Sequence, residues 1–136
     1  MNASVPGSIG SWRLKIIEGP GAGQEFNLSN LAKYKNKRLL KLGRFDPSIP
    51  LENDIFLHEN GSAFISRYHA TFEQIFKNDS EYWVIRDGQW CKKNGNIGWH
   101  LSRNGFLVNG KKGEGVVVLK PEDILEVGKV KMKVFC

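Results

Sequence analysis

The chain has 136 residues, of which 40% are hydrophobic and 25% charged. This is typical of one soluble globular domain and too short for two ordinary ones. No apolar run approaches the roughly 18–20 residues of a membrane-spanning helix, and the polar start MNASVPGSIGS lacks the apolar stretch of a secretory signal. The net charge of +6 is local, because residues 1–44 hold eight Lys and Arg against two Asp and Glu, and the remainder is balanced. A local basic segment indicates nucleic-acid binding less strongly than a basic face spread over a domain.

Residues 1–11 are small and polar, and we expect a disordered leader followed by one domain over residues 12–136. Beyond the leader, short runs typical of β-strands alternate with turn signals such as Asn94-Gly95. In the last run, Val130, Met132 and Val134 alternate with lysines, which is typical of a strand with one buried face. The predicted strands are 12–17, 24–28, 38–42, 54–57, 69–76, 82–87, 106–108, 115–119, 124–127 and 130–135.

Residues 29–42 are the one stretch with some helical periodicity. Leu31, Leu39 and Leu42 lie roughly in phase, but Lys35 interrupts the apolar face, so a full helix is not expected. About ten or eleven short strands without intervening helices predict an all-β fold, an antiparallel β-sandwich. Because strands of a sandwich are mainly scaffold, we expect the functional residues in loops at one end.

Two patterns resemble enzyme motifs but are incomplete. The segment 105–112 nearly matches a phosphate-binding loop, yet Lys112 replaces the hydroxyl residue and the segment is typical of a strand and turn. Ser66, His69 and Asp87 are the residue types of a hydrolytic triad, but no nucleophile-elbow sequence surrounds the serine. We therefore predict no catalytic residues and a protein that is not an enzyme.

Cysteines and histidines give no sign of a disulfide framework or a metal. Cys91 and Cys136 form no CxxC pair, and the three histidines lack metal-ligand spacing with them. We expect no metal and no cofactor. So few cysteines fit a reducing compartment, and we expect a cytoplasmic protein.

Three segments are rich in hydrogen-bond donors and coincide with predicted loops. They are Arg44 directly after Gly43, then Ser66-Arg67-Tyr68-His69, and finally Ser102-Arg103-Asn104-Gly105. Converging guanidinium, hydroxyl and amide groups without a catalytic base are typical of an anion site. A phosphoryl group, with a charge of about −1.5 to −2 and three acceptor oxygens, would suit them. The alternative for each loop is that its polar groups satisfy only its own backbone.

The order of these motifs resembles that of forkhead-associated (FHA) domains over about residues 12–135. The matching residues are Gly43-Arg44, Asn53-Asp54-Ile55, Ser66-Arg67-Tyr68-His69-Ala70, Asp87, Ser102-Arg103-Asn104-Gly105, Val108-Asn109-Gly110 and Val127-Gly128. The resemblance implies a β-sandwich that binds phosphothreonine peptides and mediates phosphorylation-dependent protein–protein interaction. Its expected partner is a phosphothreonine-containing protein modified by an upstream Ser/Thr kinase, with no membrane.

The resemblance also assigns roles to individual residues. It implies that Arg44 and Ser66 bind the phosphate, that Arg67 and Arg103 add phosphate or peptide contacts, and that Asn104 holds the peptide backbone. The residues implied to be structural at the site are Gly43, His69, Gly105, Asn109 and Gly110.

The chain departs from the family pattern most clearly between Asp87 and Ser102, which lie fifteen residues apart where the family has only a few. A second departure is Phe106, where threonine commonly follows the glycine. The insert 88–101 contains Asn94-Gly95 with tryptophans on both sides, which predicts a hairpin in which those tryptophans pair. The hairpin is either a closed surface feature or a ligand-selecting lid or second binding surface.

The basic segment 33–44 has two interpretations: a solvated strand pair leading to Arg44, or a source of attraction for acidic phosphopeptides. A rival hypothesis for the whole chain is a nucleic-acid-binding β domain. It would use segment 33–44 for charge and the tryptophans of insert 88–101 for stacking, but it leaves the spacing of Ser66, His69 and Asn104 unexplained.

Overall fold

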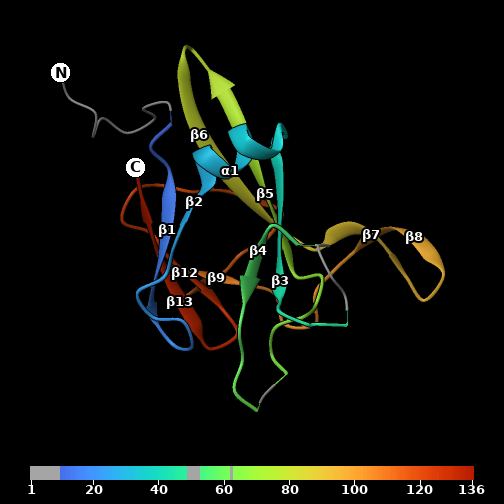
Figure 1. Cartoon of the computed structure of the whole chain (residues 1–136). Helices are drawn as coiled ribbons and strands as arrows, with labels where there is room; N and C mark the ends of the chain where they lie inside the picture. Colours follow the sequence, from blue (N-terminus) through green and yellow to red (C-terminus); the bar gives the residue numbers. More distant parts are fainter. Residues whose placement is uncertain (1–9, 49–52, 62) are drawn as a thin grey trace.

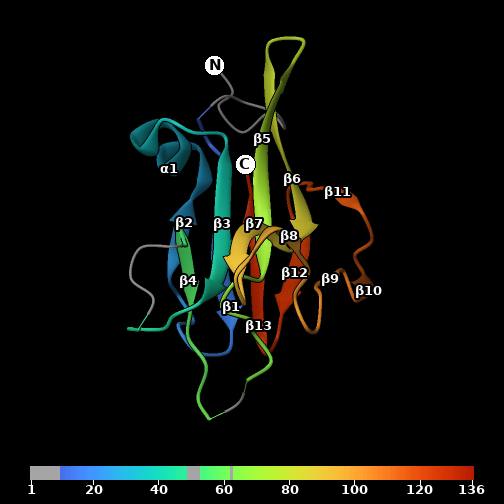
Figure 2. The same ribbon diagram turned by 90° about the vertical axis from the view of Figure 1, so that its right-hand side faces the viewer.

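The structure is a computed structural model that describes residues 10–48, 53–61 and 63–136. Two β-sheets pack face to face, a short helix lies near one end, and a two-stranded hairpin projects from the side (Figure 1; Figure 2). Residues 1–9 of the predicted leader 1–11 lie outside the described residues, so the disordered leader stays a prediction. Among the described residues, no helix has the length and apolar character to cross a bilayer.

The first sheet brings the two ends of the domain together. Its neighbouring strands β1 and β13 are antiparallel, with Leu14 opposite Val134 and Ile16 opposite Met132. The sheet has the order β10-β9-β12-β13-β1-β2. Its strands are β1 (Arg13–Glu18), β2 (Glu25–Asn27), β9 (Leu107–Val108), β10 (Lys111–Lys112), β12 (Ile124–Val127) and β13 (Val130–Phe135).

The second sheet carries the ends of the strands that lead to the predicted site. Its longest pairing is antiparallel, between β5 (Ala70–Lys77) and β6 (Ser80–Asp87). The sheet has the order β11-β6-β5-β3-β4, and its remaining strands are β3 (Leu39–Arg44), β4 (Ile55–Leu57) and β11 (Val116–Val118).

One pair departs from the predicted antiparallel arrangement, since β4 runs parallel to β3 at the sheet edge. A tight turn cannot join two parallel strands, and here residues 45–54 connect β3 to β4. Asp54 fixes the start of β4, because its N–H donates to Lys41 O at 2.8 Å and its Oδ2 accepts from Lys41 N at 2.8 Å.

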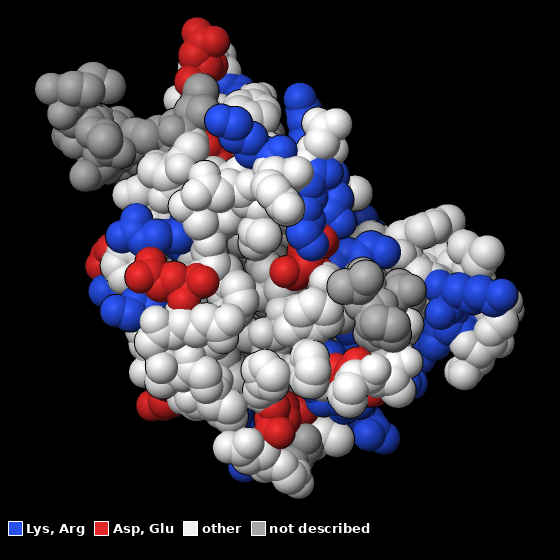
Figure 3. All heavy atoms as spheres, in the orientation of Figure 1, with Lys and Arg blue, Asp and Glu red and all other residues white. Residues whose placement is uncertain are grey.

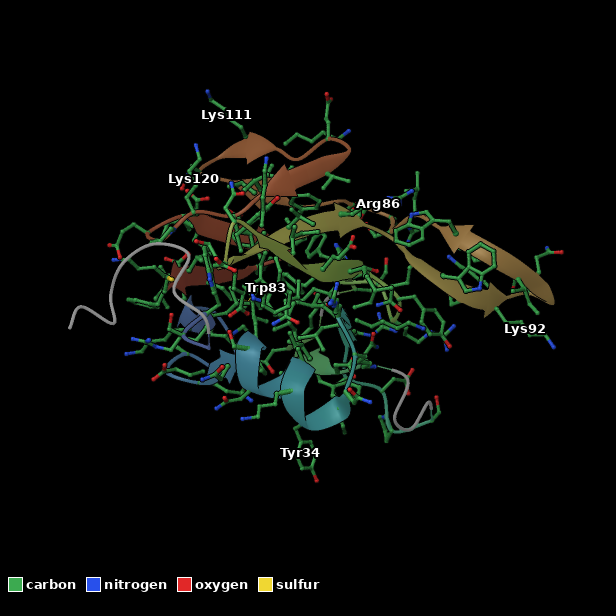
Figure 4. All side chains as sticks on the ribbon, turned by 90° about the horizontal axis from the view of Figure 1, so that it is seen from above. Tyr34, Trp83, Arg86, Lys92, Lys111 and Lys120 are labelled. Atoms are coloured by element: carbon green, nitrogen blue, oxygen red, sulfur yellow. The ribbon has the colours of Figure 1, made fainter. Side chains whose placement is uncertain are left out.

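Apolar side chains from both sheets fill the space between them. The alternation predicted for β13 is confirmed, since Val130, Met132 and Val134 are all fully buried. Trp83 on β6 points into this interior, whereas Tyr34 projects into solvent from the helix (Figure 4). The core gives the strands their register, because a slip of one residue would expose each buried face.

The helix α1 (Leu28–Lys35) occupies only the first part of the stretch that showed helical periodicity. The Asn27 side chain caps its start by accepting from Asn30 N at 2.9 Å. Asn36 ends it in the left-handed conformation with φ 53°, and its N–H donates to carbonyls of the last turn. The chain then becomes β3, so the predicted strand pair over segment 33–44 is wrong: the segment is a helix end followed by one strand.

The insert forms the predicted hairpin, from strands β7 (Gln89–Lys93) and β8 (Asn96–His100). Trp90 lies opposite Trp99, as expected, and the turn contains Asn94 and Gly95, both at positive φ. The hairpin forms a sheet of its own and extends away from the sandwich (yellow to orange in Figure 1).

Candidate functional site

The three donor-rich loops meet at one end of the second sheet. Arg44 ends β3, and its backbone N–H donates to Ser66 O at 3.0 Å. The Arg103 backbone N–H donates to Ser66 Oγ at 3.1 Å, and Asn104 Nδ2 donates to Phe64 O at 2.9 Å. The fold thus brings together residues separated by as many as 60 positions in the sequence.

A cavity of about 450 Å³ opens between these loops. Its described lining contains four cationic side chains and the Ser66 hydroxyl, and it contains no carboxylate. The lining residues are Arg44, Ala63, Ile65, Ser66, Arg67, Tyr68, Lys93, Leu101 and Arg103. Such a cavity favours an anion, because opposite charges attract and guanidinium groups form strong bonds with oxyanions.

Gly43 allows two backbones to approach at the base of the cavity. A Cβ atom there would overlap Arg67 O and the Asn53 side chain. The Asn53 Nδ2 donates to the same carbonyl at 2.7 Å and holds it in place. Any larger side chain at Gly43 would therefore push away the loop that carries Ser66 and Arg67.

His69 connects two of the loops from beneath and is fully buried. Its Nδ1 accepts from Ser66 N at 2.9 Å, so the ring proton lies on Nε2, which donates to Gly105 O at 2.7 Å. Burial lowers the pKa of His69 below 6.5, although the Gly105 bond and the nearby charge of Asp87 act in the opposite direction. The imidazole is therefore neutral at pH 7, with both nitrogens engaged.

The side chains on the cavity wall differ in how they are held. Arg44 is half-buried, and its Nη1 donates to Ile65 O at 3.1 Å, which orients the guanidinium along the loop. Arg67 is exposed and lies 3.8 Å from Asp46. The Ser66 oxygen accepts from Arg103 N, which leaves the hydroxyl proton to donate to a ligand.

The Ser102 loop remains bonded to Asp87 at the end of β6, although the insert 88–101 separates the two residues in the sequence. Ser102 Oγ donates to Asp87 Oδ1, and Ser102 N donates to Asp87 Oδ2 at 3.1 Å. Gly105, at φ +68°, then donates its N–H to Ser102 Oγ at 2.8 Å. Because Gln89 pairs with His100, the hairpin leaves and rejoins the sandwich at neighbouring points.

Six of the predicted site residues do not line the cavity: Gly43, His69 and Gly105, described above, and Asn104, Asn109 and Gly110. Asn104 is exposed at its border and uses one amide hydrogen on Phe64 O. Asn109 and Gly110 lie in the turn between β9 and β10, at φ 53° and 81°. Asn109 there accepts from Ile124 N and donates to Asp123, both at 2.9 Å, so it joins β9 to the start of β12.

Besides Tyr68 of the predicted donor loop, the cavity has four lining residues that were not predicted. Ala63 and Ile65 precede Ser66 in the chain, and Lys93 and Leu101 are contributed by the insert. The Asn94-Gly95 turn signal placed Lys93 on a hairpin but gave no information on which side of the hairpin faces the loops. That direction depends on how the hairpin base packs on the sandwich.

The basic segment is partly neutralised within the chain. Lys35 and Lys37 bind Asp54 Oδ1 at 2.7 and 2.8 Å, and Lys41 Nζ donates to Trp90 O at 3.1 Å. A second cavity, of about 400 Å³, lies beside the end of α1 and includes Lys33, but it shares no residue with the donor loops. Of the segment's cations, only Arg44 lines the first cavity.

The part of the chain that the structure describes contains no group of three or more His, Cys, Asp or Glu arranged to hold a metal ion. The fold and the site together define a two-sheet β-sandwich with a cationic cavity built from loops at one end. The family model of the FHA domain matches residues 40–128, so the chain belongs to the FHA family. No curated protein matches the chain in a sequence comparison.

Solved structures share the fold at low sequence identity. The FHA domain of the CT664 protein from Chlamydia trachomatis is 23% identical, with a TM-score of 0.60 over 92% of this chain and 96% of its own. The Slr1951 protein from Synechocystis sp. is also 23% identical, with a TM-score of 0.64 over 93% of this chain and 98% of its own. The MEK1 FHA domain in complex with a HOP1 phosphothreonine peptide is 20% identical, with a TM-score of 0.59 over 93% and 97%.

Proposed function

We propose that this FHA domain recognises phosphothreonine peptides and so mediates phosphorylation-dependent protein–protein interaction in Ser/Thr kinase signalling. The observation that carries the proposal is the cavity in which Arg44, Arg103 and the Ser66 hydroxyl converge without a carboxylate among the described lining residues. A phosphoryl group matches this set, since it brings a charge of about −1.5 to −2 and three acceptor oxygens.

Each of the two central residues has a group left for the ligand. Arg44 uses Nη1 on Ile65 O, and a guanidinium has five N–H donors, so the remaining donors are available for a phosphate. Ser66 has its hydroxyl proton, because its oxygen accepts from Arg103 N. Arg67 and Arg103 would add charge at the rim, and Asn104 would hold the peptide backbone through its amide oxygen.

Similar domains supply further support. The MEK1 FHA domain has been solved with a HOP1 phosphothreonine peptide, and the FhaA FHA domain with the intracellular domain of Rv3910. Those ligands belong to those proteins. They support a phosphopeptide as the ligand class here because the fold is shared and the donor loops lie at one end of the same sandwich.

On this proposal the protein is a binding module without catalytic activity, and it acts in the cytoplasm. A hydrolase built on Ser66 and His69 would need the imidazole to accept the serine hydroxyl proton. Here His69 Nδ1 accepts instead from the Ser66 backbone N–H, and Nε2 donates to Gly105 O. The geometry thus favours a role for His69 in holding the loops.

The test is an affinity measurement with matched phosphothreonine, phosphoserine and unphosphorylated peptides. We expect binding of the phosphothreonine peptide and loss of binding without the phosphate. The phosphoserine peptide should bind more weakly by about 1 kcal/mol, or about fivefold, because it lacks one methyl group. Equal affinity for all three peptides would refute the proposal, as would binding of an oligonucleotide together with no binding of any of the three peptides.

A further inference from the structure

The insert contributes part of the wall of the phosphate cavity. Lys93 at the end of β7 and Leu101 just after β8 both line it, beside Ser66 and Arg103. Lys93 lies next to the turn of the hairpin, and Leu101 lies at its base. Basic side chains are visible on the projecting hairpin (blue at the right of Figure 3).

The base of the hairpin is fixed to the sandwich by buried contacts. Gln89 is fully buried, and its Nε2 lies 2.8 Å from both Leu42 O and Asn53 Oδ1. Thr71 Oγ1 donates to Gly88 O at 2.8 Å. These bonds tie the start of β7 to β3 and β5, which carry the site loops at their ends.

A second set of contacts holds Trp90 and Trp99, the second cross-strand pair from the base of the hairpin. Trp99 Nε1 donates to Asp87 O at 3.0 Å, and the Arg86 guanidinium lies 4.0 Å from the Trp99 ring centre. Lys41 Nζ reaches from β3 to Trp90 O at 3.1 Å. These contacts anchor the two residue pairs of the hairpin next to the sandwich, and Lys93 lies further out, at the end of β7.

The charges on the cavity wall exceed what one phosphothreonine neutralises. Arg44, Arg67, Arg103 and Lys93 provide four positive charges, and a phosphoryl group offsets about two of them. Asp46 lies 3.8 Å from Arg67 and reduces the surplus there. Among the described residues, no carboxylate lies within salt-bridge distance of Lys93, so its charge is available to a ligand.

We propose that Lys93 forms a subsite for a second anionic side chain of the ligand, close to the phosphothreonine. The group it would take is a carboxylate of Asp or Glu or a second phosphoryl group, since both present oxyanions to an ammonium group. This inference rests on the proposed function and adds a preference to it. The domain would thereby select doubly anionic peptides among phosphothreonine ligands.

The neighbouring Lys92 provides a matched control. Successive residues of a strand point to opposite faces, and Lys92 is absent from the lining of the cavity although Lys93 lines it. Figure 4 shows Lys92 near the free end of the hairpin, directed away from the sandwich. The Lys92→Met and Lys93→Met variants change the net charge equally, so they separate a local contact from general attraction.

The experiment measures the affinity of the full chain and both variants for a set of phosphothreonine peptides. One peptide has neutral residues around the phosphothreonine, and the others carry a single Asp, Glu or phosphoserine at successive flanking positions. In the wild type we expect at least one position where the acidic residue raises affinity about fivefold, the upper range for an exposed ion pair. Comparison of the Glu and phosphoserine peptides identifies which source of negative charge the subsite prefers.

Lys93→Met should abolish that gain, whereas Lys92→Met should keep both the gain and the wild-type affinity for the neutral-flanked peptide. The gain should also shrink as salt rises from about 0.05 to about 0.5 M. Equal losses in both variants, or no acidic position that raises affinity, would overturn the subsite while phosphothreonine binding persists. Failure of every phosphothreonine peptide to bind would overturn the proposed function as well.

Discussion

Replacement of Arg44 by alanine should remove the central phosphate contact while the loop backbone stays in place. The backbone bond from Arg44 N to Ser66 O does not involve the side chain, so alanine retains it. Hydrogen bonds to charged groups contribute about 1.5–3 kcal/mol, so affinity for a phosphothreonine peptide should fall about 10- to 150-fold. The lost bond to Ile65 O should cost stability only about 1 kcal/mol, because the guanidinium is half-buried.

The assay is fluorescence anisotropy with a labelled phosphothreonine peptide at fixed ionic strength, alongside urea unfolding of each variant. Arg13→Ala is the control, because Arg13 lies on β1 of the other sheet, pairs with exposed Glu25 and carries the same charge. Arg44→Lys should bind with intermediate affinity, since it keeps the charge and loses the forked donor geometry. Affinity of Arg44→Ala within about twofold of that of Arg13→Ala would refute the assignment.

Three further predictions concern the loops around the cavity and the dependence of stability on pH. Ser66→Ala should weaken phosphopeptide binding by about 1–2 kcal/mol in the same assay, with little change in the urea midpoint, and unchanged affinity would exclude the hydroxyl as a ligand contact. Gly43→Ala should destabilise the fold by about 1–3 kcal/mol in urea unfolding, because the new Cβ would overlap Arg67 O; an unaltered midpoint would contradict the close approach. Acid should destabilise the protein in two steps. The lowered pKa of His69 means that its contribution is complete above pH 6.5 and is lost as the pH falls below that value. Burial opposes the charge of Asp54, but hydrogen bonds from Lys35, Lys37 and Lys41 N outweigh it and lower its pKa, so its contribution is present above pH 3.8 and lost below. Urea midpoints measured against pH would test both steps, and a midpoint constant between about pH 7.5 and about pH 5 would contradict the first.

Most of the fold was predictable because its signals are local. The alternation in β13 and the Asn94-Gly95 turn of the hairpin each depend on a few adjacent residues, and both predictions are confirmed. The parallel pairing of β4 with β3 was not predicted, because it depends on where the chain travels between the strands. The end of α1 at Asn36 also escaped prediction, since the apolar spacing continues past it into β3.

The residue types of the candidate site were also predictable from the sequence, whereas their arrangement in space was not. The residue types at Arg44, Ser66 and Arg103 indicated an anion site, and their order in the chain gave the family. That they share one cavity is a long-range property of the fold, and so is the presence of Lys93 beside them. The base of the hairpin that carries Lys93 is held by buried Gln89 and by the Arg86–Trp99 contact, which no local pattern encodes.

The two ends of the hairpin meet beside Asp87 and Ser102, so the domain can tolerate changes in the length and sequence of the hairpin. Segments between Trp90 and Trp99 can be lengthened, shortened or exchanged while the Asp87–Ser102 bonds and the Gly105 turn stay closed. A longer hairpin then adds little entropic cost to folding, because the chain rejoins the sandwich close to the point where it left it. Under the proposed function, ligand preference and phosphate capture would lie in separable parts of the chain, so that the preference could change while the loops of the cavity keep their framework.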